Sequence, residues 1–368
     1  MNRCLEYGGR FVRGARSLAV WVALALLPWS MNTWAQSSPD PHRPNTSPLS
    51  FDTAASIQAL AVVGEQVVYA GSFGAGMFRS ENRGGTWVPA GEGLTDAFVL
   101  SITVGRDGTV YAGTFRGGVF RRKPSATRWE ALNDGLKRLE VKTLLTSQGQ
   151  VFAGTAGGVY RLEEGASVWT AVSTGLDDTL VHALGRAVDG TLFAGTSGKG
   201  VLRHRQPRRG EPKAGEAHSG WVRLRQGLKD HEGLVENYIR VITMSPKQDL
   251  YIGTFDGGVF YSADQGDHWT PISRALPNDS IRGIVSSDHA LIVATGRGIF
   301  KTENNGQKWV PLNKGLTELS IQALVASGTS TLYAGTSGGA FRSDDGGGTW
   351  VMINEGLQVK SDVPFTFQ

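Results

Sequence analysis

The sequence is poor in cysteine and in charged residues, and it has no long apolar run. Its only cysteine is Cys4, so neither a disulfide nor thiol chemistry is expected of the folded protein. Charged residues make up 19% of the 368 residues, too few for a coiled coil, which needs charges at a helical period. The apolar stretch from Leu18 to Leu27 is shorter than the ~20 residues of a membrane-spanning helix.

Glycine and tryptophan are abundant instead. The chain has 50 glycines, about twice the usual share of ~7%, and they do not follow a collagen triplet. This pattern predicts many tight turns and therefore many short strands. A hydrophobic share of 40% together with 10 tryptophans indicates a large buried core and excludes wholesale disorder.

Residues 1–35 have the features of an export signal. Four arginines precede the apolar run, and small residues favour cleavage after Ala35. Such cleavage would remove Cys4, which precedes the apolar run and is therefore not a lipoprotein cysteine. The alternative is an uncleaved membrane anchor. We expect an exported protein, periplasmic or extracellular, that begins with a flexible spacer rich in Pro and Ser at residues 36–50.

Cleavage of residues 1–35, the leader, would also change the net charge of the protein. The net charge falls from +4 to about +1, because the leader holds four Arg and one Glu. A nearly neutral protein has no general attraction to nucleic acid.

Seven repeats account for every tryptophan after the leader. The intervals between them run from 40 to 52 residues, and each repeat has one tryptophan. The seven are Trp87, Trp129, Trp169, Trp221, Trp269, Trp309 and Trp350.

The repeats share one order of elements. An apolar strand is followed by a turn, a second strand ending in Ala-Gly-Thr or a near copy, a Gly-rich hairpin and a third strand. The tryptophan opens a fourth strand, and most repeats close with Gly-Leu. Four strands in about 40–45 residues is the period of a propeller blade. We therefore predict an all-β fold, one seven-bladed β-propeller over residues 51–358 with four antiparallel strands per blade.

Two features of this architecture stay open in the sequence. A linear solenoid is the rival fold, but it would need polar end repeats, and neither end looks like one. The ring could close edge to edge between the first and last repeats. Alternatively Val363–Phe367, in the C-terminal tail of residues 359–368, could add a closing strand.

The segment before the tryptophan follows the pattern Ser/Thr-x-Asp/Asn-x-Gly-x-x-Trp in four repeats. These residues are Ser80, Asn82, Gly84 and Trp87; Ser262, Asp264, Gly266 and Trp269; Thr302, Asn304, Gly306 and Trp309; and Ser343, Asp345, Gly347 and Trp350. The pattern resembles the Asp-box (BNR) repeat superfamily, which includes sialidases, tandem-propeller xyloglucanases, sortilin-type receptors and photosystem II assembly-factor propellers. The last group resembles this chain most in size and single-propeller layout.

The physical role of this segment is structural. Asp, Asn, Ser and Thr side chains bond the backbone of their own turn, Gly takes a positive φ, and Trp fills the gap between sheets. One carboxylate per turn is far from the six to eight oxygens of a calcium site, so we expect no metal. The resemblance implies that the ligand lies on the opposite face. Repeats two to four lack the pattern. The insertion His204 to Gly220 is either a solvated loop or a basic tether for an acidic partner or a membrane surface.

No catalytic constellation is visible. Gly335 to Gly339 matches a nucleophile-elbow pattern, but it is one copy of the repeated hairpin and not a strand-to-helix turn. The histidines lack metal-ligand spacing, and the Arg-Ile-Pro signature of sialidases is absent. We therefore expect no catalytic residue, no cofactor and no metal. A glycoside hydrolase is the enzymatic alternative.

The second residue of each first strand points to a candidate binding site opposite the Asp boxes. The seven are Gln58, Leu100, Lys142, His182, Arg240, Arg282 and Gln322. Four consecutive repeats thus offer a basic or potentially basic side chain, suited to a carboxylate, a phosphate or an acidic peptide. Alternatively these side chains pair with carbonyls of a neighbouring blade, or with Asp256 and Asp279.

The hairpins of the same face add further candidates. Arg116 and Arg297 would add charge. Phe73, Phe115 and Phe255 occupy equivalent hairpin positions, and an exposed aromatic group there would favour binding. We therefore expect an exported, monomeric, non-enzymatic binding or assembly scaffold with a protein partner or an anionic ligand. The alternative is a sialidase-like protein that binds or hydrolyses a glycan.

Overall fold

The computed structural model describes residues 53–172, 175–204, 220–229, 238–277 and 280–359. All of them belong to one unit, Ser50–Gln368, whereas the unit Met1–Leu49 lies outside the described residues. The expected export signal, spacer and tail, and most of the insertion after His204, therefore lie outside them too. The described residues form strands and turns, with no helix, and so none that could cross a membrane.

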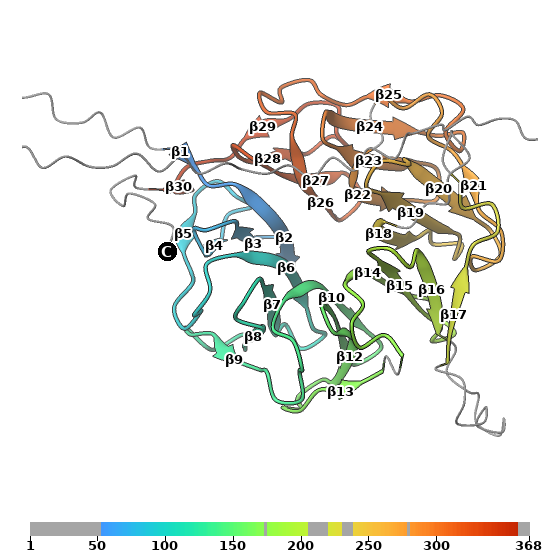
Figure 1. The fold of residues 1–368 in the computed structure, drawn as a ribbon. Coiled ribbons are helices and arrows are strands. Elements are labelled where there is room, and N and C mark those ends of the chain that lie inside the picture. Colours follow the sequence, from blue (N-terminus) through green and yellow to red (C-terminus); the bar gives the residue numbers. More distant parts are fainter. Residues whose placement is uncertain (1–52, 173–174, 205–219, 230–237, 278–279, 360–368) are drawn as a thin grey trace, which may run out of the picture. The chain divides into compact units, whose positions relative to one another are not determined.

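The strands form seven four-stranded antiparallel sheets, each built from four consecutive strands, which confirms the seven-bladed propeller (Figure 1). The first strands of the blades are β2 (Ile57–Val63), β6 (Val99–Val104), β10 (Val141–Ser147), β14 (Val181–Arg186), β18 (Ile239–Met244), β22 (Ile281–Ser286) and β26 (Ile321–Ser327). The second strands are β3 (Val67–Ser72), β7 (Val110–Thr114), β11 (Gln150–Thr155), β15 (Leu192–Thr196), β19 (Leu250–Thr254), β23 (Leu291–Thr295) and β27 (Thr331–Thr336).

The third and fourth strands are shorter. The third strands are β4 (Met77–Ser80), β8 (Val119–Arg122), β12 (Gly158–Glu163), β16 (Val201–His204), β20 (Val259–Ser262), β24 (Gly298–Thr302) and β28 (Gly339–Ser343). The fourth strands are β5 (Val88–Pro89), β9 (Glu130–Ala131), β13 (Thr170–Ala171), β17 (Trp221–Leu224), β21 (Thr270–Pro271), β25 (Val310–Pro311) and β29 (Val351–Met352).

The Ala-Gly-Thr motif has a local reason. The second strands are inner strands of their sheets, and the neighbouring sheets cover them on both faces. They are therefore buried along nearly their whole length, as in β7. The threonine then shapes the hairpin that follows. Thr114 Oγ1 donates to the carbonyl of Gly118 and accepts the N–H of Gly117, both at 3.0 Å. The same arrangement recurs in other blades, for example at Thr254.

Contacts between the first strands close the ring. Each first strand contacts the first strand of the next blade, and β26 of the last blade contacts β2 of the first. A short clasp adds to this: β1 (Thr53–Ala54) pairs antiparallel with β30 (Gln358–Val359). Closure in the described residues therefore combines edge-to-edge packing with a two-stranded clasp that the sequence did not indicate. The alternative strand at Val363–Phe367 lies outside the described residues.

The repeated tryptophans join neighbouring blades. All seven are buried. In six of them the indole N–H donates to a backbone carbonyl of the preceding blade, as from Trp129 to Ala90 at 2.7 Å and from Trp169 to Leu132 at 2.8 Å. Each tryptophan therefore supplies apolar area to the interface between blades, and six of the seven add a directed hydrogen bond.

The turns before four tryptophans are held by their own side chains. Ser262 Oγ accepts the N–H of Gly266 at 2.8 Å, and Asp264 Oδ1 accepts the N–H of His268 at 2.9 Å. Ser80, Thr302 and Ser343 accept in the same way. We call the face that carries these turns the turn face. The opposite face, which carries the hairpins between second and third strands, is the hairpin face.

Candidate functional site

Every first strand has a β-bulge at its second residue. In β10, for example, Val141 pairs with Thr155 and Thr143 with Gly154, so Lys142 has no partner in the ladder. The same register shift occurs in the other six blades. A bulge bends the strand and redirects the side chain of the extra residue. Seven bulges at equivalent positions therefore redirect seven side chains in the same way.

These seven side chains line one cavity of about 290 Å³, here named the central cavity. Its lining includes Gln58, Leu100, Lys142, His182, Arg240, Arg282 and Gln322. The bulges lie at the end of the first strands next to the hairpin face, because Ile239 pairs with Thr254 at the start of a hairpin. The structure thus brings together the four basic positions that the sequence aligned.

Two arginines carry the charge of the central cavity. Burial lowers the pKa of Arg240 to about 10, and the neighbouring Arg282 lowers it further. Burial also lowers the pKa of Arg282. Both remain charged at neutral pH. Arg240 Nη1 and Arg282 Nε are buried and have no hydrogen-bond partner. The cavity therefore holds two partly desolvated cations with unused donors, which is unfavourable unless an anion is bound.

The other two basic positions are partly neutralised. Lys142 Nζ pairs with Glu140 at 2.9 Å. His182 Nε2 bonds to Ser197 Oγ at 2.6 Å. Burial, then Lys142 and Arg240, lower the pKa of His182 to about 4, so this residue is neutral at pH 7. The sequence-based view of His182 as potentially basic therefore does not hold at neutral pH.

Replacing His182 by glutamine should make stability less dependent on pH. The folded-state pKa of about 4 lies below the ordinary value of 6.5, so the unfolded state binds more protons between these pH values. Stability is therefore expected to fall as pH drops from about 6.5 towards 4, and less so in His182→Gln. Urea unfolding at pH 7 and pH 5 measures this difference. An equal loss in both proteins would contradict the prediction.

The predicted hairpin arginines lie outside the central cavity. Arg116 and Arg297 are exposed on their hairpins and do not line it. Arg116 instead lies 5.3 Å from the ring centre of Phe115. Lys142 Nζ lies 5.1 Å from the same ring. The hairpin arginines therefore border the basic residues of the cavity without joining them.

The aromatic hairpin residues are accessible. Phe73 and Phe255 are each 55% exposed. Arg240 lies 5.3 Å from the ring centre of Phe255. Phe98 links Phe73 and Phe115, with ring centres 4.8 and 6.4 Å away. The exposed rings therefore continue the surface from the cavity mouth onto the hairpin face.

Two site residues were missed in the sequence. Glu140 partners Lys142, and Ser197 partners His182. Glu140 lies only two residues before Lys142 in the chain, so this pair could have been found. Ser197 comes from a hairpin and has no such signal. Of the acids first considered as partners, Asp279 lies outside the described residues. Arg282 Nη1 instead donates to Gln322 Oε1 of the next blade.

Among the described residues, no group of three His, Cys, Asp or Glu side chains is placed to hold a metal ion.

Comparison with known proteins finds one family model and several solved structures that are similar to this chain. Residues 235–366 match the family model described as the DUF6242 beta propeller domain. We find no match among the curated proteins. The structure titled "YCF48 bound to D1 peptide" has a TM-score of 0.61 at 14% identity, covering 81% of this chain and 95% of that chain.

Two larger structures are also similar. NkGH74, a GH74 enzyme of Niastella koreensis, has a TM-score of 0.61 at 13% identity, covering 84% of this chain and 55% of its own. The extracellular domain of BT3049 from B. thetaiotaomicron has a TM-score of 0.64 at 17% identity, covering 79% of this chain and 39% of its own. The chain thus spans only about two fifths of the extracellular domains from that organism that it matches. At these identities the likeness shows the fold alone.

Proposed function

We propose that this protein is an exported, non-catalytic propeller that binds an anionic group of a protein partner at the hairpin face. The observation that carries the proposal is the pair Arg240 and Arg282, whose partly buried guanidinium groups line one cavity, each with a buried nitrogen that has no hydrogen-bond partner. Guanidinium groups bind carboxylate and phosphate through two parallel bonds, and such bonds strengthen where water is excluded.

The surroundings of the central cavity suit a protein partner. A volume of about 290 Å³ can hold a carboxylate or phosphate group with part of its side chain. The exposed Phe73 and Phe255 would add apolar contact outside the cavity. The basic residues would thus fix the position of the partner, and the aromatic hairpins would add affinity.

Two of the similar structures support binding and export as features of this proposal. YCF48 is a propeller of similar extent whose structure holds a peptide, and BT3049 contributes an extracellular domain. We extend both features to this chain as part of the proposal, with residues 1–35 as the cleaved signal and residues 36–50 as a spacer. The resemblance of the turns to Asp boxes belongs to the same proposal.

Glycan binding or hydrolysis is the second candidate, because the fold is shared with a GH74 enzyme. Ordinary glycoside hydrolysis needs two carboxyl groups about 5–9.5 Å apart. The described residues that line the central cavity include no Asp or Glu. The composition of this lining favours binding of an anion over hydrolysis of a sugar.

Replacing both cavity arginines by methionine should abolish anion binding without loss of stability. In Arg240→Met/Arg282→Met we expect the affinity for sulfate and citrate to fall at least about tenfold, because both guanidinium groups are lost. Thermal stability should stay equal or rise, because two buried cations without full partners become apolar. Titration calorimetry and thermal unfolding give both values.

The matched control is Arg116→Met/Arg297→Met, which removes the same charge from exposed hairpins. This variant should keep its affinity for sulfate and citrate. If it loses as much affinity as the cavity variant, net charge and not the cavity determines binding. A glycan array then decides for the second candidate if wild type binds a neutral sugar and no anion.

A further inference from the structure

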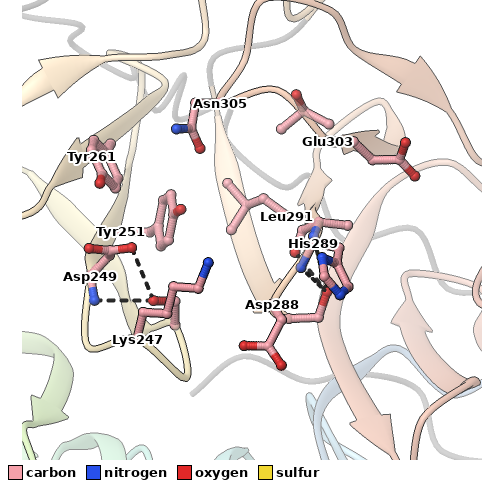
Figure 2. A pocket seen from close by; sticks show the side chains of 13 residues that line it. Lys247, Asp249, Tyr251, Tyr261, Asp288, His289, Leu291, Glu303 and Asn305 are labelled. Carbon is pink, nitrogen blue, oxygen red and sulfur yellow. Dashed lines mark hydrogen bonds between the residues drawn. The ribbon is translucent and has the colours of Figure 1, made fainter.

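A second cavity lies on the turn face, between the blade of β18–β21 and the blade of β22–β25, and is named here the blade 5/6 groove. Its volume is about 410 Å³. Tyr251 and Tyr261 lie on one side of it and Asp288 and His289 on the other (Figure 2). Asn305, in the turn before Trp309, also lines the groove. Asp249, Asp288 and Glu303 add carboxylates to the lining.

Comparison of the blades shows what distinguishes this groove. One position of the third strand pairs with the buried second strand in every blade, as in Phe193↔Arg203 and Tyr333↔Arg342. The residue is basic in six blades and is Tyr261 in the fifth, where the pair is Tyr251↔Tyr261. The six basic residues are Arg79, Arg121, Arg161, Arg203, Lys301 and Arg342.

Three of these arginines bridge to the next blade. Arg121 Nη1 donates to the carbonyl of Ala166 at 3.2 Å, and its Nη2 lies 3.3 Å from Glu130. Arg203 Nη1 donates to the carbonyl of Gln265 at 3.0 Å, and its Nη2 lies 2.9 Å from Asp267. Arg342 Nη1 donates to the carbonyl of Arg83 at 2.8 Å, and its Nε donates to Asp344 at 3.1 Å. Each guanidinium therefore binds a backbone carbonyl of the next blade together with a carboxylate.

Two of the three accepting carbonyls belong to equivalent residues. Arg83 and Gln265 have φ values of 59° and 56°, in the turn before the tryptophan of their blade. Asn305, with φ 49°, holds this position in the blade 5/6 groove. No described side chain donates to its carbonyl, because Tyr261 replaces the arginine of the preceding blade. The groove thus presents this acceptor without the guanidinium that meets its equivalents at Gln265 and Arg83.

The charges around the groove favour a cation. Three carboxylates line it, whereas Lys247 and His289 are the basic residues of its lining. One carboxylate, Glu303, pairs with Lys301 at 2.6 Å. Burial, and then the charge of Asp249, raise the pKa of Tyr251 to about 12. Tyr251 and Tyr261 stand with ring centres 5.3 Å apart and offer aromatic surface that a guanidinium can contact.

We propose that the blade 5/6 groove binds an arginine side chain of a partner protein, whose guanidinium takes the place that Arg203 and Arg342 take in the equivalent grooves. Arginine suits the site better than lysine, because one planar guanidinium can donate to a carbonyl and to a carboxylate at the same time. The inference is independent of the central cavity, which lies at the hairpin face and would take an anion.

The test uses the full chain and the peptide acetyl-Gly-Arg-Gly-amide, with its citrulline counterpart as an uncharged probe of the same shape. Wild type should bind the arginine peptide at least about tenfold more tightly than the citrulline peptide in titration calorimetry. Tyr261→Arg should lose this binding, because the new arginine occupies the groove from within the chain. Equal binding of both peptides by wild type would overturn the proposal.

Two further variants make the test specific. Val88→Arg adds the same charge at an exposed position on another blade and should bind as wild type does. If it loses binding as Tyr261→Arg does, general charge repulsion explains the loss and the proposal falls. If Tyr261→Arg does not fold, Asp249→Asn/Asp288→Asn takes its place. That variant should weaken binding of the arginine peptide several-fold, and unchanged binding would overturn the proposal.

Discussion

Replacing Trp87 by alanine should lower the free energy of unfolding by ~3–5 kcal/mol, the usual cost of deleting a buried aromatic side chain. Trp87 is buried at the closure of the ring, in a core cluster with Tyr333, Ile353 and Leu357 of the last blade. Its indole N–H donates to the carbonyl of Ile353 at 2.7 Å, and its backbone N–H donates to Glu355 at 2.8 Å. The substitution removes both the apolar contact and the indole bond between the two ends of the propeller.

Val88→Ala is the matched control. Val88 follows Trp87 directly and is 57% exposed, so its truncation should change stability by no more than ~0.5 kcal/mol. Chemical denaturation of the three proteins, followed by tryptophan fluorescence and circular dichroism, gives the values. A loss of under ~1 kcal/mol in Trp87→Ala would show that this interface is not closely packed, against the mutational range for buried aromatic residues.

The other side of the same interface should be nearly as sensitive. Gly356 has φ 88°, and a Cβ built there would lie 2.0 Å from the carbonyl oxygen of Trp87. In Gly356→Ala the chain must therefore adopt an unfavourable backbone conformation and also move away from Trp87. We expect a loss of at least ~2 kcal/mol in the free energy of unfolding. The Gly-Leu that ends most repeats is explained by this close approach.

Gly328→Ala separates the cost of the backbone conformation from the cost of the close approach between blades. Gly328 also has a positive φ, 65°, but a Cβ there would meet nothing within 4 Å. Its substitution should cost only the backbone term, ~1–2 kcal/mol. The blade of β18–β21 has Ala275 at the position equivalent to Gly356, and there the described residues show no bond from the backbone N–H of Trp309 to the preceding blade. Equal losses in Gly356→Ala and Gly328→Ala would refute the role of close approach.

The blades could be predicted because their pattern is local and repeated. The interval between tryptophans, the Ala-Gly-Thr ends and the Gly-Leu turns each report a short stretch of chain, so seven units and four strands per unit follow from the sequence. The clasp of β1 with β30 could not be predicted. It pairs two-residue strands from opposite ends of the unit, and such short strands have no alternation to recognise.

The candidate site could be predicted in part. Aligning the repeats put Lys142, His182, Arg240 and Arg282 at equivalent positions, and the structure gathers all four in the central cavity. Their charges could not be predicted, because burial and neighbouring groups set them. The pKa of His182 falls to about 4 through burial beside two cations, and a hairpin serine completes its contacts.

The sequence by itself determined the repeat, the number of blades and which side chains occupy equivalent places, because these depend on residue spacing along one strand. The tertiary structure decided how those side chains act. Seven β-bulges, which are defined only by the pairing between strands, direct seven side chains towards one cavity. The contact between blades likewise decides why Tyr261 matters, since its arginine counterparts in three other blades bind a backbone carbonyl of the following blade. The charge, the burial and the hydrogen-bond partners of these side chains depend on neighbouring residues, and those residues come from distant parts of the chain.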